Sequence, residues 1–334
     1  MDGVIHTVEA LEAQVGTRPD AVNLKVIDHL DVHAQRWLAA SPLAFAGFSD
    51  AHQVAATLVG GAPGFASAPE PGQLRVPRAA LDDPQHAQAG RGAGLLFLIP
   101  GLGETLRING VVADTSTADI LINVQECYAH CAKALLRSDF WRPDPGADPQ
   151  DAAAFLQACR FMALATADAA LHTDLSPKGD PAGSLVQAYG DGIRYADRPG
   201  NRRTDSLRNI LQRPDAAALL IVPGCTRVAA AQGRAQISAD PAQRRAFMVQ
   251  DKTPKLVTSL AAPVLVLRES AALARSRPWL SPVPPADIDP AEIFAAHVRL
   301  NKTRGLGAAI SRAMVSIPGL MRKGLQQDYK RNMY

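Results

Sequence analysis

An internal repeat constrains the fold of this chain more than any other feature. Residues 95–113 read LLFLIPGLGETLRINGVVA, and residues 219–235 read LLIVPGCTRVAAAQGRA. Each segment is an apolar run, a Pro-Gly pair and a second run, and Gly110 and Gly233 follow their Pro-Gly pairs at the same spacing. Two apolar runs separated by a turn that contains Pro and Gly predict a β-hairpin in each segment.

Further matched segments surround both hairpins in the same chain order. Residues 41–50 parallel 159–168, residues 120–126 parallel 264–269, and residues 133–141 parallel 272–279. Two unrelated β domains with similar turns are the alternative, but this many features in one order favour a duplicated unit. A solenoid needs at least three shorter repeats. Because the runs are short and bounded by turns, we expect a mainly β fold with helices (α+β).

Two proline-rich segments divide the chain. Residues 142–151 (RPDPGADPQD) and 281–290 (SPVPPADIDP) have the composition of linkers. They predict a first unit at residues 1–143, a linker at 144–154, a second unit at 155–280 and a helical tail at 281–334.

Both ends of the chain are expected to be helical. Before residue 41, apolar side chains at three-four spacing predict one helical face, and Asp20 is the expected N-cap. That face comprises Leu24, Val26, Ile27, Leu30, His33, Ala34 and Trp37. In the tail the helical pattern breaks near Gly305 and at Pro318-Gly319, and we expect its apolar residues to pack on the protein rather than on a membrane surface. Its basic residues are Arg299, Lys302, Arg304, Arg312, Arg322, Lys323, Lys330 and Arg331.

Composition excludes several classes of protein. With 47% hydrophobic residues the chain can bury a core, and a net charge of +3 is far below that of a typical nucleic-acid binder. Nothing in the sequence approaches the ~20 apolar residues of a membrane span, and the first residues do not resemble a signal peptide. Four cysteines in 334 residues do not make a disulfide framework. We therefore expect a cytoplasmic protein without nucleic-acid partners.

Two polar motifs in the second unit point to an anion. Residues 176–180 read SPKGD, and residues 197–209 read DRPGNRRTDSLRN. Gly200 would let backbone amides approach a ligand, and the guanidinium groups of Arg202 and Arg203 suit phosphate oxygens. Thr204 or Asp205 could cap a helix that begins near Ser206, and helix N-termini favour anions. The motif predicts a phosphate cradle, and the alternative is a solvated basic loop beside a helix cap.

These motifs resemble the pyridoxamine 5′-phosphate oxidase-like family of FMN-binding split β-barrels, in particular a bacterial subgroup with SPKGDP and DRPGNRR motifs. The segments LSPKGDPAG, YADRPGNRRTDSLRNILQRP and LLIVPG carry the resemblance in the second unit. In the first unit it rests on VGTRPDAVNLKVIDHLDVHAQRWLAASP, GLLFLIPGLGETLRINGVVA and HCAKALLRSDFW. The resemblance spans about residues 8–143 and 155–280. It implies two tandem split barrels that form an internal pseudo-dimer around FMN.

The resemblance also implies the residues that would bind the cofactor. The phosphate loop would be Asn201, Arg202 and Arg203, shaped by Arg198 and Gly200. Ser176, Lys178 and Asp180 would line the ribityl chain and ring. Thr105 and Arg107, in ETLRING of the first unit, would reach the flavin from the partner barrel. Lys133, Arg137, Ser138 and Trp141 could close the flavin site or the substrate pocket.

Each unit departs from the family pattern where the other keeps it. The first unit reads ATLVGGAPGF and VPRAALDDPQHAQ in place of the two polar motifs. The second unit has Val228 and Ala230 where the first has Thr105 and Arg107. A symmetric dimer repeats every contact, whereas a fused pseudo-dimer can lose one of its two sites. We therefore expect one composite FMN site per chain.

The segment CYAHCAKALLRSDFW is expected to be a helix with Cys127 and Cys131 one turn apart. His130 lies beside them, but a metal site needs a third or fourth ligand, and we expect no metal. The alternative role for this segment is a helix that only packs on its barrel through Leu135 and Trp141.

The resemblance implies an FMN-dependent oxidoreductase that transfers hydride through flavin N5 to or from a small organic substrate. Candidate catalytic residues are Lys178, Arg107 and His172, although His172 could be an ordinary loop histidine. NADH or NADPH is a candidate electron donor. The alternatives are a deazaflavin enzyme, or a non-catalytic flavin- or haem-binding sensor that would use His130 or His172 as a haem ligand. Monomer and homodimer both remain open.

Overall fold

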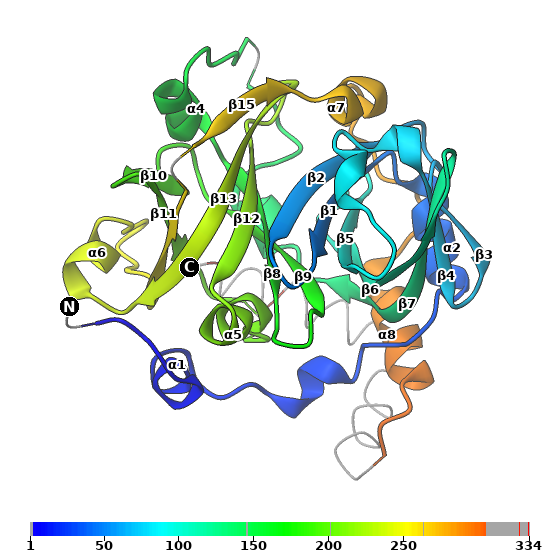
Figure 1. Ribbon diagram of the computed structural model, residues 1–334, viewed down its shortest axis with the longest axis horizontal. Helices are drawn as coiled ribbons and strands as arrows, with labels where there is room; N and C mark the ends of the chain where they lie inside the picture. Colours follow the sequence, from blue (N-terminus) through cyan, green and yellow to red (C-terminus); the bar gives the residue numbers. More distant parts are fainter. Residues whose placement is uncertain are drawn as a thin grey trace.

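The computed structural model describes residues 3–144, 146–200, 202–262, 264–304, 327 and 333. Its core is two antiparallel sheets side by side (Figure 1). The first sheet has the order β2-β1-β5-β6-β7-β4-β3. Its strands are β1 Leu43–Ser49, β2 Val54–Gly60, β3 Ser67–Glu70, β4 Gln73–Pro77, β5 Gly92–Leu98, β6 Thr105–Thr115 and β7 Asp119–His130.

The second sheet repeats this topology strand for strand. Its order is β9-β8-β12-β13-β14-β11-β10, with β15 also paired to β13. Its strands are β8 Phe161–Ala167, β9 Thr173–Gly179, β10 Val186–Tyr189, β11 Gly192–Asp197, β12 Asp215–Ile221, β13 Arg227–Ser238, β14 Leu256–Ala261 and β15 Val266–Glu269. The predicted fold class, mainly β with helices in two split-barrel halves, is confirmed.

Short helices connect and cover the two sheets. They are α1 Val8–Val15, η1 Asp20–Asn23, α2 Val32–Ala40, η2 Arg78–Ala80, η3 Pro84–His86, α3 Lys133–Arg137, α4 Ala152–Ala158, α5 Asp205–Gln212, α6 Pro241–Arg245, α7 Ala271–Ser276 and α8 Pro290–Leu300. Helix α5 ends before Pro214 and the strand β12 follows, since Pro disfavours helix in the residue that precedes it.

Strands β1 and β8 are buried on both faces because they lie between a barrel core and the junction of the halves. In β1, Phe48 faces the core of the first barrel, whereas Phe45 packs within the junction. There the Phe45 and Phe161 rings lie 5.3 Å apart. Gly47 lets the strands approach, since a Cβ on it would lie 2.8 Å from the Ala165 Cβ.

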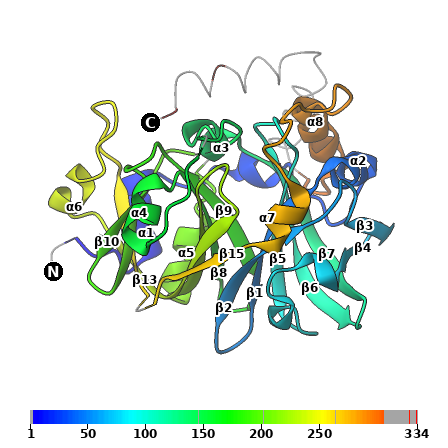
Figure 2. The ribbon, with the colours of Figure 1, turned by 90° about the horizontal axis from the view of Figure 1, so that it is seen from above.

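The halves contact each other through matching helices. Arg137 in α3 donates from Nε to the Gly179 carbonyl at 2.9 Å, and Arg275 in α7 donates from Nε to the Gly60 carbonyl at 3.0 Å. Each glycine allows the opposing helix to approach closely, because a Cβ on Gly179 or on Gly60 would collide with the backbone of that helix. Figure 2 shows α3 and α7 on their opposite sheets.

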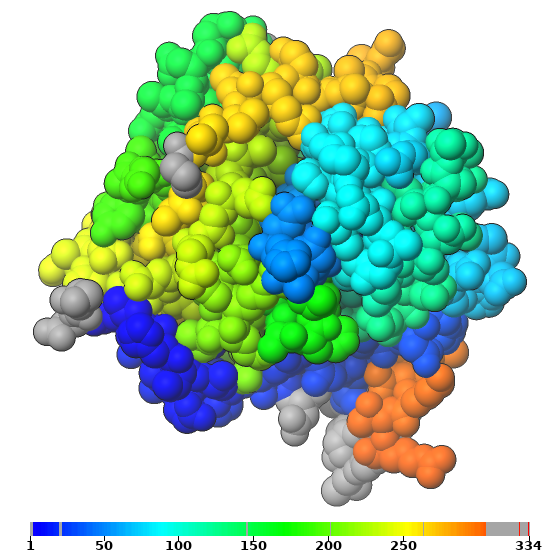
Figure 3. Space-filling model, in the orientation of Figure 1, coloured from blue at the N-terminus to red at the C-terminus, as the bar shows by residue number. Residues whose placement is uncertain are grey.

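The chain ends cross between the halves. Ile5 and Leu11 belong to the core of the second half, and Ile5 N–H donates to the Ile237 carbonyl at 2.9 Å. In α8, Ile293 packs into the core of the first half. The N-terminal segment runs beneath both halves in the space-filling view (Figure 3). The start of the predicted first unit thus packs on the second half, and α8 of the predicted tail packs on the first half.

The prediction of one helical face up to Ala40 was wrong. Residues 24–31 are not helical, and Ile27 exchanges backbone hydrogen bonds with Cys127 of β7. The helix starts later, with Asp31 as N-cap through a 2.8 Å bond from the Ala34 amide. The extended segment gains strand pairing and still buries Leu24, Ile27 and Leu30. The side chain of Asp20, and the tail breaks at Gly305 and Pro318, lie outside the described residues.

The prediction of one helix from Cys127 to Trp141 was also wrong. Residues up to His130 finish β7, which pairs with β6, and only Lys133–Arg137 form the helix α3. Cys127 and Cys131 therefore do not share a helix face. Apolar residues at short spacing fit either structure, and the neighbouring strand β6 decided between them.

Candidate functional site

A cavity of about 600 Å³ lies where α3 and the β6–β7 pair of the first half meet the second half. Its volume is within the range of ligand and cofactor pockets. The lining comes from both halves and from the N-terminal segment. It comprises Val15, Arg107, His130, Cys131, Lys133, Ala134, Arg137, residues 176–180, Leu185, residues 196–200, residues 202–207 and Lys255.

The lining is strongly cationic. Eight Lys or Arg side chains line the cavity, against three aspartates. The cations are Arg107, Lys133, Arg137, Lys178, Arg198, Arg202, Arg203 and Lys255, and the aspartates are Asp180, Asp197 and Asp205. An excess of five positive charges in a concave, partly dry site favours an anionic ligand.

The end of β9 supplies one wall. Lys178 donates to Asp197 at 2.9 Å, and Arg198 donates from Nε to Asp180 at 2.6 Å. Burial raises the pKa of the Asp180 carboxyl, and the charges of Arg198 and Arg137 oppose this. Asp180 therefore holds Arg198 in place rather than lying open to a ligand.

Helix α3 supplies the part of the lining next to the end of β9. Lys133 is only 2% exposed although it lines the cavity. The Arg137 guanidinium also donates from Nη1 to the carbonyls of Pro199 at 3.1 Å and Met333 at 2.8 Å. This one side chain therefore joins α3, the polar loop of the second half and a residue near the end of the chain.

The two adjacent arginines of the loop lie in different surroundings. Arg202 is exposed, whereas Arg203 is 6% exposed and stacks 4.5 Å from the Tyr128 ring centroid. Arg203 donates to Asp205 and, at 3.4 Å, to Glu126 of the first half. The left-handed backbone at Arg202 and Thr204 (φ 56° for each) produces this divergence. Asn201 lies outside the described residues.

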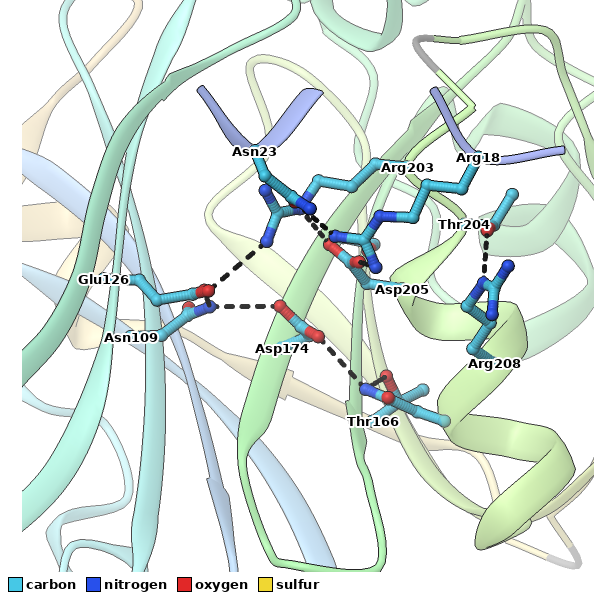
Figure 4. Close-up of polar contacts among 12 residues, drawn as sticks. Arg18, Asn23, Asn109, Glu126, Thr166, Asp174, Arg203, Thr204, Asp205 and Arg208 are labelled. Atoms are coloured by element: carbon cyan, nitrogen blue, oxygen red, sulfur yellow. Dashed lines mark hydrogen bonds and ion pairs between the residues drawn. The ribbon is translucent and has the colours of Figure 1, made fainter. Parts of the chain in front are cut away.

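A network of polar contacts beside the cavity joins the two barrels (Figure 4). Arg107 donates to the Tyr128 hydroxyl at 2.9 Å and to Asp174 at 3.2 Å. Asn109 donates to Asp174 at 3.0 Å and to Glu126 at 2.8 Å. Burial opposes the charged form of Arg107, but the neighbouring Tyr128, Asp174 and Asp205 raise its pKa overall.

The N-terminal segment extends this network. Arg18 lies 3.3 Å from Asp205, and Glu12 pairs with Arg208 of α5. Burial raises the pKa of Asp205, and the nearby Asp174 raises it further, while Arg203 opposes both. The segment thus ties its own charges to the start of α5.

Sequence reasoning missed Glu126, Tyr128 and Asp174, which contact residues of the lining, and the place of Cys131 and His130 in the lining itself. It also missed Lys25, which is buried and donates from Nζ to the Ala129 carbonyl of β7 at 2.6 Å. Asp174 had a usable signal, because strand alternation places it on the same face as Ser176 and Lys178. Tyr128 and His130 carried no such signal, because their segment is predicted as a helix, in which these two side chains do not share a face. Among the described residues, no group of three or more His, Cys, Asp or Glu side chains could hold a metal ion.

Some predicted site residues lie away from the described cavity lining. Thr105 is 1% exposed and lies behind it on β6. The Trp141 ring packs against Phe140 at 4.9 Å and donates from Nε1 to the Leu102 carbonyl. Ser138 is buried and donates to the Leu135 carbonyl. The His172 side chain is 62% exposed and pairs with Asp168 on the surface.

Two carboxylates of the first half, in the segment VPRAALDDPQHAQ that stands in place of the second unit's arginine-rich motif, contact the second half. Asp82 accepts hydrogen bonds from Ser270 Oγ at 2.5 Å and from the Ala272 amide at 2.8 Å. Asp83 pairs with Arg268 of β15. Both carboxylates are therefore engaged by residues of the second half, because Arg268 also lies 3.7 Å from Asp82.

Residues 149–284 match the family model described as pyridoxamine 5′-phosphate oxidase. No curated protein matches the chain. Among solved structures, HupZ of Group A Streptococcus is 16% identical, with 36% of this chain and 93% of that chain covered and a TM-score of 0.30. An F420 reductase is 15% identical over 36% and 98% of the two chains, with a TM-score of 0.27. The heme storage protein HutZ of Vibrio cholerae is 12% identical over 36% and 93%, with a TM-score of 0.26. In the described part of the chain, no helix is long and apolar enough to cross a membrane.

Proposed function

We propose that this protein is an FMN-dependent oxidoreductase that acts on a small organic substrate and binds one FMN in the composite cavity. The observation that carries the proposal is the cationic cavity itself, built jointly by both halves. The cations of the second half belong to the segment that matches the pyridoxamine 5′-phosphate oxidase family model. Bound FMN would supply hydride transfer, which needs no protein nucleophile.

The residues present fit a flavin phosphate. A phosphate monoester carries about 1.5 to 2 negative charges at neutral pH, fewer than the positive excess of the lining. Lys133, Arg137 and Arg202 surround the loop of Arg198 and Gly200, and a Cβ on Gly200 would meet nothing within 4 Å. This open turn leaves room for a phosphate beside the backbone. We assign Asn201 to the same loop from the sequence alone.

Two of the three catalytic candidates line the cavity. Arg107 and Lys178 lie on opposite barrels and would orient the cofactor or substrate and stabilise negative charge that develops there. Ser176 lies next to Arg107, since Arg107 donates from Nη2 to Ser176 Oγ at 3.4 Å. His172 is too exposed and too far from the lining to carry the proposal.

We also propose that the chain arose by tandem duplication and lost one of two sites. The identical strand order of the two sheets and the reciprocal contacts of Arg137 and Arg275 support this origin. Asp82 and Asp83 support the loss, because they stand in the segment that replaces the arginine-rich motif and are engaged by Ala272 and Arg268 rather than open to a phosphate.

The absorbance spectrum of the purified protein tests the proposal, followed by anaerobic addition of NADH or NADPH. Visible flavin bands that bleach with the reductant, and return when a suitable acceptor is added, are expected. A protein that takes up no FMN on reconstitution would refute the proposed function. A deazaflavin spectrum would keep the cavity but replace the cofactor.

A second candidate function is a non-catalytic flavin- or haem-binding protein. His130 favours it, because this histidine lines the cavity and, among the described residues, its Nδ1 has no hydrogen-bond partner. A Soret band in the same spectrum, lost in His130→Ala, would identify haem. Flavin bands that no reductant changes would identify a carrier.

A further inference from the structure

The arginine-rich loop of the second half offers one arginine to a ligand rather than an adjacent pair. Arg203 lines the cavity, but its guanidinium group stacks on the Tyr128 ring. The same group donates to Asp205 and Glu126. Arg202 is exposed and lines the cavity. Because the two side chains diverge, a second cation beside Arg202 would come from another part of the chain.

The two halves differ in one connection that ends at this cavity. In the first half, β6 and β7 are joined by the short turn 116–118. In the second half, the corresponding strands β13 and β14 are joined by residues 239–255, which include α6 and end at Lys255. Lys255 lines the cavity, although it lies outside both polar motifs of the second unit. The longer connection therefore brings a cation to the site that the motifs do not contain.

Buried contacts hold this connection in place. Phe247 is 1% exposed and packs with Ala196 of β11 and Val257 of β14. Arg244 of α6 donates from Nε to the Pro254 carbonyl at 2.8 Å, directly before Lys255. The backbone at Lys255 is therefore positioned by packing on the second barrel.

Strand pairing places Lys255 beside the arginine-rich loop. In the antiparallel pair β11–β14, Asp197 lies opposite Leu256. The same register brings Lys255 opposite Arg198, which is the first residue after β11 and the start of the loop. Lys255 thus reaches the cavity from the strand next to this loop.

Lys255 and Arg202 differ from the neighbouring cations of the lining. Lys178 and Arg198 are each held by an aspartate. Among the residues that the structure describes, neither Lys255 nor Arg202 has a hydrogen bond or an ion pair. Lysine binds phosphate as a point charge on a flexible stem, so it does not need the fixed geometry that a guanidinium fork requires. Two cations without a partner therefore stand at the same loop.

We propose that Lys255 and Arg202 form the cation pair that binds the phosphate of the ligand, in place of Arg202 and Arg203. Lys255 Nζ and the Arg202 guanidinium would each donate to phosphate oxygens beside Gly200, where the open turn leaves room. A phosphate monoester carries about 1.5 to 2 negative charges at neutral pH, which two cations match. The inference rests on the proposed function, because it adds a residue to the FMN site.

A comparison of FMN with riboflavin tests this assignment, because the two ligands differ only by the phosphate. Each is titrated into the full-length protein and followed by flavin fluorescence. We expect Lys255→Met to weaken FMN binding about tenfold through loss of one charged hydrogen bond, and to leave riboflavin binding unchanged. Lys255→Arg should keep most of the FMN affinity. Lys252→Met is the matched control, because Lys252 is exposed in the same connection but does not line the cavity.

Inorganic phosphate provides a reading that does not depend on the flavin. Its binding, followed by phosphorus NMR, should also weaken about tenfold in Lys255→Met. The inference is overturned if Lys255→Met binds FMN as the wild type does, or if it loses affinity for FMN and riboflavin equally. If the wild type binds no FMN, the proposed function fails. A loss of phosphate affinity in Lys255→Met would then still support the assignment of Lys255, whereas no phosphate binding or an unchanged phosphate affinity would overturn it.

Discussion

Replacing Arg203 by Ala should destabilise the protein far more than replacing its neighbour Arg202. The Arg203 side chain is 7% exposed and pairs with Asp205, whose side chain is 8% exposed. Removing one partner of a buried ion pair leaves an uncompensated charge and costs 3–5 kcal/mol. In the Arg203→Ala variant, Asp205 would still have two cationic neighbours, Arg18 at 3.3 Å and Arg107 at 3.6 Å. We therefore expect a loss of unfolding free energy at the lower end of this range, about 3 kcal/mol.

Urea denaturation followed by tryptophan fluorescence measures this loss. With an m value of about 3 kcal/mol/M, a loss of about 3 kcal/mol lowers the midpoint by about 1 M. Arg202→Ala is the matched control, because Arg202 is exposed at the cavity. Its midpoint should stay at the wild-type value, while FMN affinity falls about tenfold through loss of a charged hydrogen bond.

A double variant separates lost charge compensation from lost packing. If the buried charge of Asp205 causes the destabilisation, Arg203→Ala with Asp205→Asn should be more stable than Arg203→Ala alone. An Arg203→Ala protein as stable as the wild type would refute the reasoning. So would a double variant with no recovery, because the stacking of Arg203 on Tyr128 would then account for the whole effect.

Three further predictions follow from the same structure. Reconstitution should saturate at one FMN per chain, measured by flavin absorbance against protein concentration, and two per chain would contradict the loss of the second groove. Burial lowers the pKa of Lys25 from 10.5 to about 8, so the folded protein binds fewer protons than the unfolded chain between these values. The unfolding free energy of the wild type relative to Lys25→Met should therefore rise by up to about 3 kcal/mol from pH 8 to 10.5, and a pH-independent difference would show that Lys25 is not desolvated. Phe161→Ala removes a ring whose centroid lies 5.3 Å from that of Phe45 and 4.9 Å from that of Phe140 at the junction of the halves. The unfolding free energy measured by urea denaturation should fall by about 3–5 kcal/mol. A loss under about 1 kcal/mol would mean that the junction repacks.

The repeat, the hairpins and the turns could be predicted from the sequence because they are local. Pro-Gly turns and apolar runs of strand length specify a hairpin with little help from the rest of the chain. Residues 95–98 and 219–221 lie in the strands β5 and β12, and the residues after each turn form β6 and β13. The polar motifs around Lys178 and Arg198 could also be recognised in the sequence, because packing of an apolar core does not require charged residues at the end of a strand.

Predictions of helices from the spacing of apolar residues were less reliable. Ile27 and Cys127 each fit a helical pattern, yet the two pair with each other in extended conformation. Three-four spacing and short strand runs share many positions, and a partner strand distant in sequence determines which one forms. That partner cannot be read from either segment alone.

Only the tertiary structure decided what the adjacent arginines do and which polar atoms lack partners. Arg202 and Arg203 are neighbours in the sequence, but with the backbone torsions found here the Arg202 side chain is exposed and the Arg203 side chain stacks on Tyr128. The environment of His130 depends on Lys25, Arg107 and Arg203, which lie far apart in the sequence. Charges and solvation act through space rather than along the chain. The pKa shifts, the buried ion pairs and the buried polar atoms without partners are therefore determined only when both barrels and the N-terminal segment are in place.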